Sequence, residues 1–160
     1  MIDFDKKLCI VGDVHFGYGN LNFLESQIRF FIELLIPYLK SKGIKIIIFT
    51  GDFFDNRKHL DINMKNRVCD LIENELKDFQ VIVYLGNHDV VFKNTNIVNS
   101  LRFLKLFPNF TVIEEITQMK ILGKNFLFVP WLYDLKNFKR YIDENDVSEV
   151  DVCFGHFDII

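Results

Sequence analysis

Four short stretches of the 160-residue chain each combine a glycine with side chains that bind metal ions or transfer protons. They are Gly12-Asp13-Val14-His15, Gly51-Asp52-Phe53-Phe54-Asp55, Gly86-Asn87-His88-Asp89 and Gly155-His156. Aspartate, asparagine and histidine together form a ligand set for Mn, Fe or Zn, and they differ from the thiolate set of a structural zinc site. A carboxylate that bridges two cations about 3.5–4 Å apart is suited to phosphoryl chemistry.

An apolar run that predicts a buried strand precedes each stretch. These runs cover residues 7–11, 44–50, 80–85 and 151–154. Apolar residues recur at helical spacing over residues 21–40 and 62–79. The alternation of strands and helices predicts a mostly parallel α/β sheet. Because ligands bind at the carboxyl ends of parallel strands, we expect the four stretches to converge there.

The rest of the chain predicts shorter elements. A short helix is expected over residues 97–106, and short strands are expected in FTVIEE, TQMKIL and NFLFVP, with a turn at Gly123-Lys124-Asn125. A polar helix is expected over residues 134–145. No repeat, low-complexity tract or linker interrupts the sequence, which predicts a single domain over residues 1–160.

Each motif taken alone also has a plain structural explanation. A Gly-Asp pair usually forms a turn, and a single histidine after a strand is more often a capping residue. Asn87 would be an ordinary turn residue that tolerates left-handed geometry. Four such strand endings in one chain favour a functional site over four independent turns.

Composition limits the classes of protein to be considered. The chain has 49% hydrophobic residues, 26% charged residues and a net charge of -3, so composition gives no indication of nucleic-acid binding. No apolar run approaches the ~18 residues of a membrane span, and the acidic start does not resemble a signal peptide. Cys9, Cys69 and Cys153 lack a CxxC pattern and predict reduced structural thiols in an intracellular protein, cytoplasmic or nucleoid-associated.

The ordered series GDVH, GDFFD, GNHD and GH resembles the calcineurin-like metallophosphoesterase superfamily over residues 12–156. The resemblance implies an α/β fold of the αββα sandwich type and two divalent metal ions, Mn in the first place and Fe, Zn or Mg as alternatives. By position, Asp13 and His15 would bind the first metal and Asp52 would bridge both. Asn87 and His156 would bind the second metal.

Two further residues have roles that the resemblance implies. His88 matches the family's non-ligand histidine, which contacts the scissile phosphate or protonates the leaving group, and Asp89 would orient it. An imidazole is suited to proton transfer near neutral pH.

The residues that flank the motifs resemble one branch of the superfamily. GDFFDNRK, GNHDVVFKN, VPW and CFGHFD look like the SbcD-type nucleases, the phage and viral recombination endonuclease subunits. Protein phosphatases differ, because they continue GDxxD with Arg-Gly and GNH with Glu. The resemblance implies an exonuclease and endonuclease of DNA repair and recombination, with an SMC-like ATPase partner and a homodimer as further expectations. A phosphomonoesterase, a cyclic-nucleotide phosphodiesterase and a non-catalytic member of the fold are the alternatives.

Several residues near the motifs have two interpretations. Arg57 and Lys58 could hold phosphate oxygens of a substrate or belong to a solvated loop. Lys93 and Asn94-Thr95-Asn96 could line a substrate groove. Trp131 could stack on a base, although packing is the usual role of such a residue. His59 is expected to be a surface loop residue.

The end of the series departs from the family pattern. The family supplies a downstream Gly-His-x-His motif, whereas His156 is followed here by Phe157 and Asp158. We expect GHFD to be the penultimate motif, so that the domain is incomplete at its C-terminus and each metal is one imidazole short. The alternative is that GHFD is a degenerate final motif.

Overall fold

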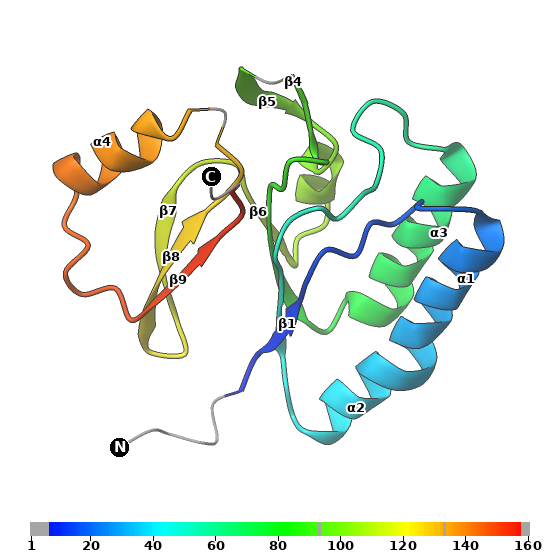
Figure 1. Ribbon diagram of the computed structural model, residues 1–160. Coiled ribbons are helices and arrows are strands. Elements are labelled where there is room, and N and C mark those ends of the chain that lie inside the picture. The colour runs from blue at the N-terminus through cyan, green and yellow to red at the C-terminus, as the bar shows by residue number, and fades with distance from the viewer. Residues whose placement is uncertain (1–6, 93, 133, 158–160) are drawn as a thin grey trace.

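The computed structural model describes residues 7–92, 94–132 and 134–157. Two larger β-sheets have helices on their outer sides (Figure 1), and a third sheet has only two strands. The first sheet is entirely parallel and has the strand order β1-β2-β3-β6. Its strands are β1 (Cys9–Val11), β2 (Ile46–Phe49), β3 (Gln80–Tyr84) and β6 (Phe110–Ile113). The predicted parallel α/β sheet is therefore confirmed.

The second sheet contains β7 (Thr117–Ile121), β8 (Lys124–Val129) and β9 (Val152–Gly155). β7 and β8 are antiparallel and are joined by a tight turn in which Leu122 and Gly123 both have positive φ. β9 runs parallel to β8. Figure 1 shows this sheet facing the first one, with α4 (Lys136–Glu144) on its far side. The order of layers is thus helix, sheet, sheet, helix, as the αββα prediction requires.

Helices cover the other face of the first sheet. The segment predicted over residues 21–40 is one continuous rod, made of α1 (Leu21–Arg29), the π-helical η1 (Phe30–Leu35) and α2 (Ile36–Ser41). The second rod is α3 (Ile62–Leu71) followed by the π-helical η2 (Ile72–Leu76). Asn20 and Asp61 cap the two rods, because their side chains accept hydrogen bonds from free backbone N–H groups of the first turns. No helix within the described ranges is both long and apolar enough to cross a membrane.

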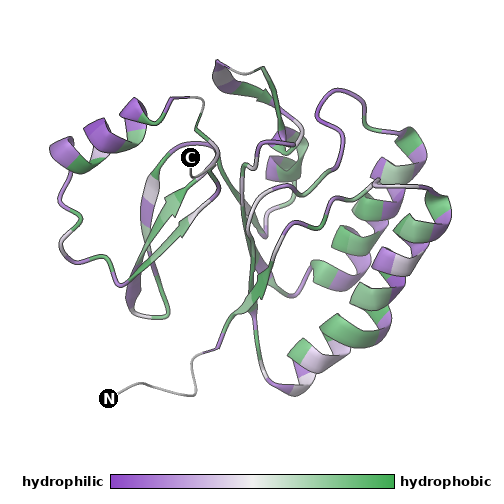
Figure 2. Cartoon of the chain, viewed as in Figure 1, coloured by the Kyte–Doolittle hydropathy of each residue, from purple (hydrophilic) through white to green (hydrophobic). Residues whose placement is uncertain are grey.

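Alternate residues of the central strands enter two separate apolar clusters. Ile47, Phe49, Val81 and Val83 pack toward the helices, whereas Ile48, Ile82 and Tyr84 pack toward the second sheet. Both faces of these strands are covered, which explains why their sequences are almost continuously apolar. In Figure 2 the strands are accordingly mostly green, and purple residues lie on the outer faces of the helices.

The helix predicted over residues 97–106 is only partly correct. Thr95–Asn99 forms β5, which pairs antiparallel with β4 (Val90–Phe92), and only Arg102–Leu106 is helical, as the 3-10 turn η3. Ile97 and Val98 are β-branched residues whose side chains favour extended backbone when a partner strand is available. That partner is the segment that follows GNHD, which was not predicted to be a strand.

Candidate metal centre

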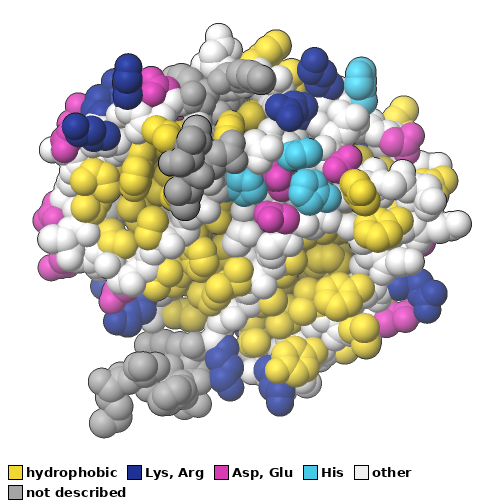
Figure 3. Space-filling view, viewed as in Figure 1, with side chains coloured by type: hydrophobic (Ala, Val, Ile, Leu, Met, Phe, Trp, Pro, Cys, Tyr) yellow, Lys and Arg dark blue, Asp and Glu magenta, His cyan; other side chains and the backbone are white. Residues whose placement is uncertain are grey.

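The loops after β1, β2, β3 and β9 meet at one edge of the two sheets. Figure 3 shows histidine and acidic side chains gathered there. Three non-glycine residues of these loops have positive φ: Asp13 (36°), His15 (50°) and Asp52 (47°). Such backbone costs on the order of 1–3 kcal/mol per residue and is concentrated at functional sites in proteins. Sheet topology therefore brings the predicted residues together in strained loops.

Asp52 occupies the centre of the cluster and is almost fully buried. Its Oδ1 accepts a hydrogen bond from the backbone N–H of His88 at 2.8 Å. Its Oδ2 lies 3.6 Å from Nε2 of His15 and 3.6 Å from Nε2 of His156. One carboxylate oxygen thus faces two imidazoles from opposite ends of the chain, which is the arrangement that a bridging ligand needs.

His156 has a fixed tautomer. Its Nδ1 lies 2.9 Å from the carbonyl oxygen of Thr50, and because a carbonyl can only accept, Nδ1 carries the hydrogen. Nε2 therefore directs its lone pair toward Oδ1 of Asn87, 3.0 Å away, and toward Oδ2 of Asp52. Nε2 of His156, Oδ1 of Asn87 and Oδ2 of Asp52 can each donate an electron pair, and together they form a ligand set that suits a divalent cation. A backbone carbonyl that orients a histidine in this way is typical of metal sites.

His15, Asp55 and His88 form a second group at the same edge. Each offers one ligand atom, and these atoms lie within 4.8 Å of one another. Nδ1 of His15 is 3.4 Å from Oδ1 of Asp55, and Nδ1 of His88 donates to the Asp55 carbonyl at 2.7 Å. Asp55 was not assigned a role from the sequence. It is the last residue of the GDFFD motif, and that place in the motif could have identified it as a candidate ligand.

Asp13 and Asp89 lie at opposite extremes of exposure. The Asp13 side chain is 61% exposed, and its Oδ1 lies 3.9 Å from Nδ1 of His156, at the rim of the cluster. Asp89 is fully buried. Its carboxylate accepts hydrogen bonds from four groups, namely the backbone N–H of Phe53, of Phe54 and of Gly86 and the hydroxyl of Ser100.

Asp89 thereby ties the loop after β2 to the turn that contains Asn87 and His88. Burial raises the pKa of Asp89 to about 6, while the three amide donors act to lower it. The direct contact to the His88 ring comes from the Asp55 carbonyl, so any orienting effect of Asp89 on that ring acts through the loop.

Comparison with known proteins decides the family. The family model "Calcineurin-like phosphoesterase" matches residues 6–158. The chain belongs to the calcineurin-like phosphoesterase family. The phosphoesterase is 28% identical over 132 residues to "Exonuclease subunit 1" of Enterobacteria phage T4, an alignment that covers 80% of this chain and 38% of the phage protein. The chain thus spans well under half of that relative's length.

A solved structure supports the fold. The phosphoesterase is similar to the "Protein of Unknown Function AQ665" from Aquifex aeolicus, with a TM-score of 0.50 and 20% identity, over 96% of this chain and 80% of the other. At this identity the likeness concerns the fold alone.

Glycine is required at two positions beside the predicted metal ligands. A Cβ on Gly86 would overlap the carboxylate and the backbone nitrogen of Asp52, and a Cβ on Gly51 would lie 2.6 Å from Nδ1 of His156. Gly51 also has φ +89°, a conformation that other residues rarely adopt. Both glycines thus let two strand ends approach closely enough for Asp52 and His156 to lie side by side.

We expect Gly86→Ala to weaken Mn binding at least ~10-fold, because the added methyl group displaces the Asp52 carboxylate. Isothermal titration with Mn measures the effect. Gly43→Ala is the matched control: Gly43 has φ +67°, so alanine is strained there, but nothing lies within 4 Å of its Cβ position. A Gly86→Ala protein that binds Mn as the wild type does would contradict the close-approach explanation.

The remaining predicted residues lie around the centre. Asn56 accepts hydrogen bonds from the backbone N–H of Lys58 and of His59, which shapes the loop after β2. Among the described contacts, the Arg57 and Lys58 side chains form no hydrogen bond or ion pair; Lys58 is exposed and Arg57 is half-buried. His59 is exposed, as predicted.

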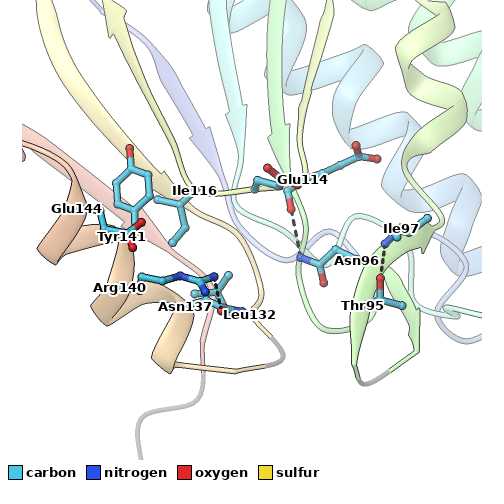
Figure 4. A pocket seen from close by; sticks show the side chains of 11 residues that line it. Thr95, Asn96, Ile97, Glu114, Ile116, Leu132, Asn137, Arg140, Tyr141 and Glu144 are labelled. Carbon is cyan, nitrogen blue, oxygen red and sulfur yellow. Dashed lines mark hydrogen bonds between the residues drawn. The ribbon is translucent and has the colours of Figure 1, made fainter.

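Trp131 and the segment after GNHD lie farther out. The Trp131 ring packs against the apolar core and meets the His156 ring edge to face at 6.4 Å, which agrees with a packing role. Thr95 and Asn96 line a hollow of about 530 Å³ between β5 and α4 (Figure 4), and no metal-centre residue lines it. Lys93 lies outside the described residues.

Proposed function

We propose that this phosphoesterase is a two-metal phosphodiesterase that hydrolyses DNA, as an exonuclease and endonuclease subunit of a recombination and repair complex. The observation that carries the proposal is the position of Asp52 Oδ2, equidistant from the imidazoles of His15 and His156. The name of the phage relative, "Exonuclease subunit 1", supports nuclease activity, and DNA as the substrate is part of the proposal. An SMC-like ATPase partner, a homodimer and an intracellular location are further parts of the proposal.

The ligand assignment follows the sequence motifs. In this proposal, Asp13, His15 and Asp52 hold the first metal, and Asp52, Asn87 and His156 hold the second, with Mn as the preferred ion. Asp55 is an additional candidate ligand on the His15 side, since its carboxylate lies 3.4 Å from that ring. When bound, two divalent cations supply Lewis-acid stabilisation of the phosphate charge. The further histidines of a Gly-His-x-His motif stay a sequence-based prediction.

His88 is the proposed proton donor. Its Nδ1 hydrogen is held by the Asp55 carbonyl, so Nε2 is the atom that exchanges a proton with the leaving oxygen. The Asp52 carboxylate holds the His88 backbone, and Asp89 holds the Gly86 amide in the same turn. One contact therefore holds the ring and two hold the backbone of its turn before substrate binds, which lowers the cost of orienting the ring.

Hydrolysis assays with three substrates test the substrate class. The substrates are end-labelled duplex DNA, p-nitrophenyl phosphate and a cyclic nucleotide, and each assay contains Mn. We expect DNA to be cleaved and cleavage to stop after chelation of the metal. Preference for the monoester or the cyclic nucleotide would replace the nuclease proposal with one of those activities. Metal binding without hydrolysis of any substrate would identify a non-catalytic member of the fold.

The charges of Arg57 and Lys58 are proposed to contact DNA phosphates. The double variant Arg57→Ala/Lys58→Ala should weaken DNA binding equally for all sequences and reduce the slope of log affinity against log salt by about 2, near 0.9 per lost phosphate contact. Fluorescence anisotropy at several salt concentrations measures the slope. Lys139→Ala/Arg140→Ala on α4 is the control with the same loss of charge. An equal change of slope in both double variants would show that the loss of positive charge in general, and not contact of Arg57 and Lys58 with phosphates, weakens DNA binding.

A further inference from the structure

Gln27 occupies a position on α1 where the helical pattern predicts an apolar side chain. Leu24, Ile28 and Phe31 lie at helical spacing around it, and all three are buried in the core. Gln27 itself is half-buried. A polar side chain on such a stripe costs stability unless it is hydrogen-bonded, so its contacts indicate what it does there.

The Gln27 side chain reaches the loop after β1. Its Nε2 donates to the backbone carbonyl of Val14 at 2.6 Å. Because a carbonyl can only accept, this contact fixes the amide with its nitrogen toward the loop. The amide oxygen Oε1 is buried and has no hydrogen-bond partner among the described residues. The amide thus completes the hydrogen bonding of the loop while its own oxygen stays unpaired, which is an unfavourable arrangement for a residue that serves packing alone.

Few other bonds hold the loop after β1, which leads from the first sheet to α1 (Figure 1). Within the described part of the chain, residues 12–14 take part in no other hydrogen bond. The next anchor is the amide of His15, which donates to the Asp52 carbonyl at 2.9 Å. Asp13 and His15 both have positive φ, so Val14 lies between two strained residues. The strained segment is therefore held at Val14 by one side chain.

A hollow of about 350 Å³ lies between this loop and the rod of α1, η1 and α2. The polar side chains that line it are those of Ser26 and Gln27. The Ser26 hydroxyl donates within α1 to the Asn22 carbonyl at 2.9 Å. Gln27 is thus the described side chain of the rod that forms a hydrogen bond across to the loop.

We propose that Gln27 is a positioning residue of the metal centre, which holds the strained loop so that Asp13 and His15 bind the first metal. This role rests on the proposed two-metal centre. Gln27 touches neither metal nor substrate, and it acts through the Val14 carbonyl, which lies between the two proposed ligands. Residues that orient metal ligands in this way typically contribute 10–100-fold to the affinity of a metal site.

Gln27→Met removes the donor and keeps an unbranched side chain that suits the apolar stripe. Isothermal titration with Mn should show at least ~10-fold weaker binding at the first site and unchanged binding at the second. The metal-free variant should be no less stable to heat than the wild type, because the unpaired amide oxygen is removed together with the hydrogen bond. Ser26→Ala is the matched control, since it removes a hydrogen bond that stays within α1.

Hydrogen exchange of the metal-free proteins tests the loop without any bound ion. The amide of His15 should exchange faster than in the wild type both in Gln27→Met and in Gln27→Glu, because a carboxylate has the shape of the amide but no donor. Circular dichroism verifies that each variant is folded. If one variant fails to fold, the exchange of the His15 amide in the other decides.

Equal Mn affinity of Gln27→Met and the wild type at the first site would overturn the positioning role. An equal loss at both sites, together with lower stability of the metal-free protein, would overturn it too, because Gln27 would then act through packing alone. A wild type that binds no Mn would contradict the proposed metal centre instead. The His15 amide then decides separately whether Gln27 holds the loop, and exchange at the wild-type rate in both variants would show that it does not.

Discussion

Replacing Asp52 by asparagine should abolish Mn binding at both sites at once. Asp52 Oδ2 faces His15 and His156 equally, so the substitution weakens the only ligand shared between the two proposed metals. Loss of an outer-shell partner already costs a metal site 10–100-fold in affinity, so loss of a bridging charge should cost more than ~100-fold at each site. DNA hydrolysis should fall below detection with it.

Isothermal titration with Mn, followed by the DNA cleavage assay, measures both losses. Asp143→Asn is the matched control, because it removes one exposed carboxylate on α4 far from the centre. Two-site binding that survives in Asp52→Asn would remove Asp52 from the bridging position. Loss of a single site would make it a ligand of one metal only.

Replacing His88 by asparagine should separate metal binding from catalysis. The His88 Nδ1 hydrogen is held by the Asp55 carbonyl, and its Nε2 is proposed to deliver a proton rather than to bind metal. The metal content should therefore persist, while the rate of hydrolysis falls ~10²–10⁴-fold, the usual contribution of general acid catalysis.

Metal analysis and single-turnover cleavage of labelled DNA, carried out on the same preparation, test this separation. His59→Asn serves as the control, since His59 is an exposed histidine on the loop after β2. A parallel loss of metal and activity in His88→Asn would assign His88 to the ligand group that it forms with His15 and Asp55. The proton would then have to come from another group.

The hydrophobic pattern predicted the strands before the glycine motifs and the helical rod. The apolar runs before the glycine motifs became β1, β2, β3 and β9, and the helical spacing over residues 21–40 became one continuous rod. The pattern failed at Thr95–Asn99, where exposed β-branched residues pair with a segment that has no strand signal of its own. The π-helical turns over Phe30–Leu35 and Ile72–Leu76 were not predicted from the sequence either.

The sequence likewise predicted which residues would meet but not how they would contact one another. Asp52, Asn87, His15 and His156 converge because the topology places their strand ends at one edge. The fixed tautomer of His156 depends on the Thr50 carbonyl. Every residue has a backbone carbonyl, so a contact of this kind cannot be predicted from the residue types. For the same reason, the four hydrogen bonds to Asp89 and the role of the Asp55 carbonyl appeared only in the folded chain.

Anomalous diffraction from crystals soaked in Mn is the most direct test of a two-metal centre. The proposal predicts two peaks about 3.5–4 Å apart on either side of Asp52 Oδ2, one toward His15 and the other toward His156 and Asn87. A single peak inside the group of His15, Asp55 and His88, with Asp52 outside coordination distance, would contradict the two-metal centre and the catalytic role of His88.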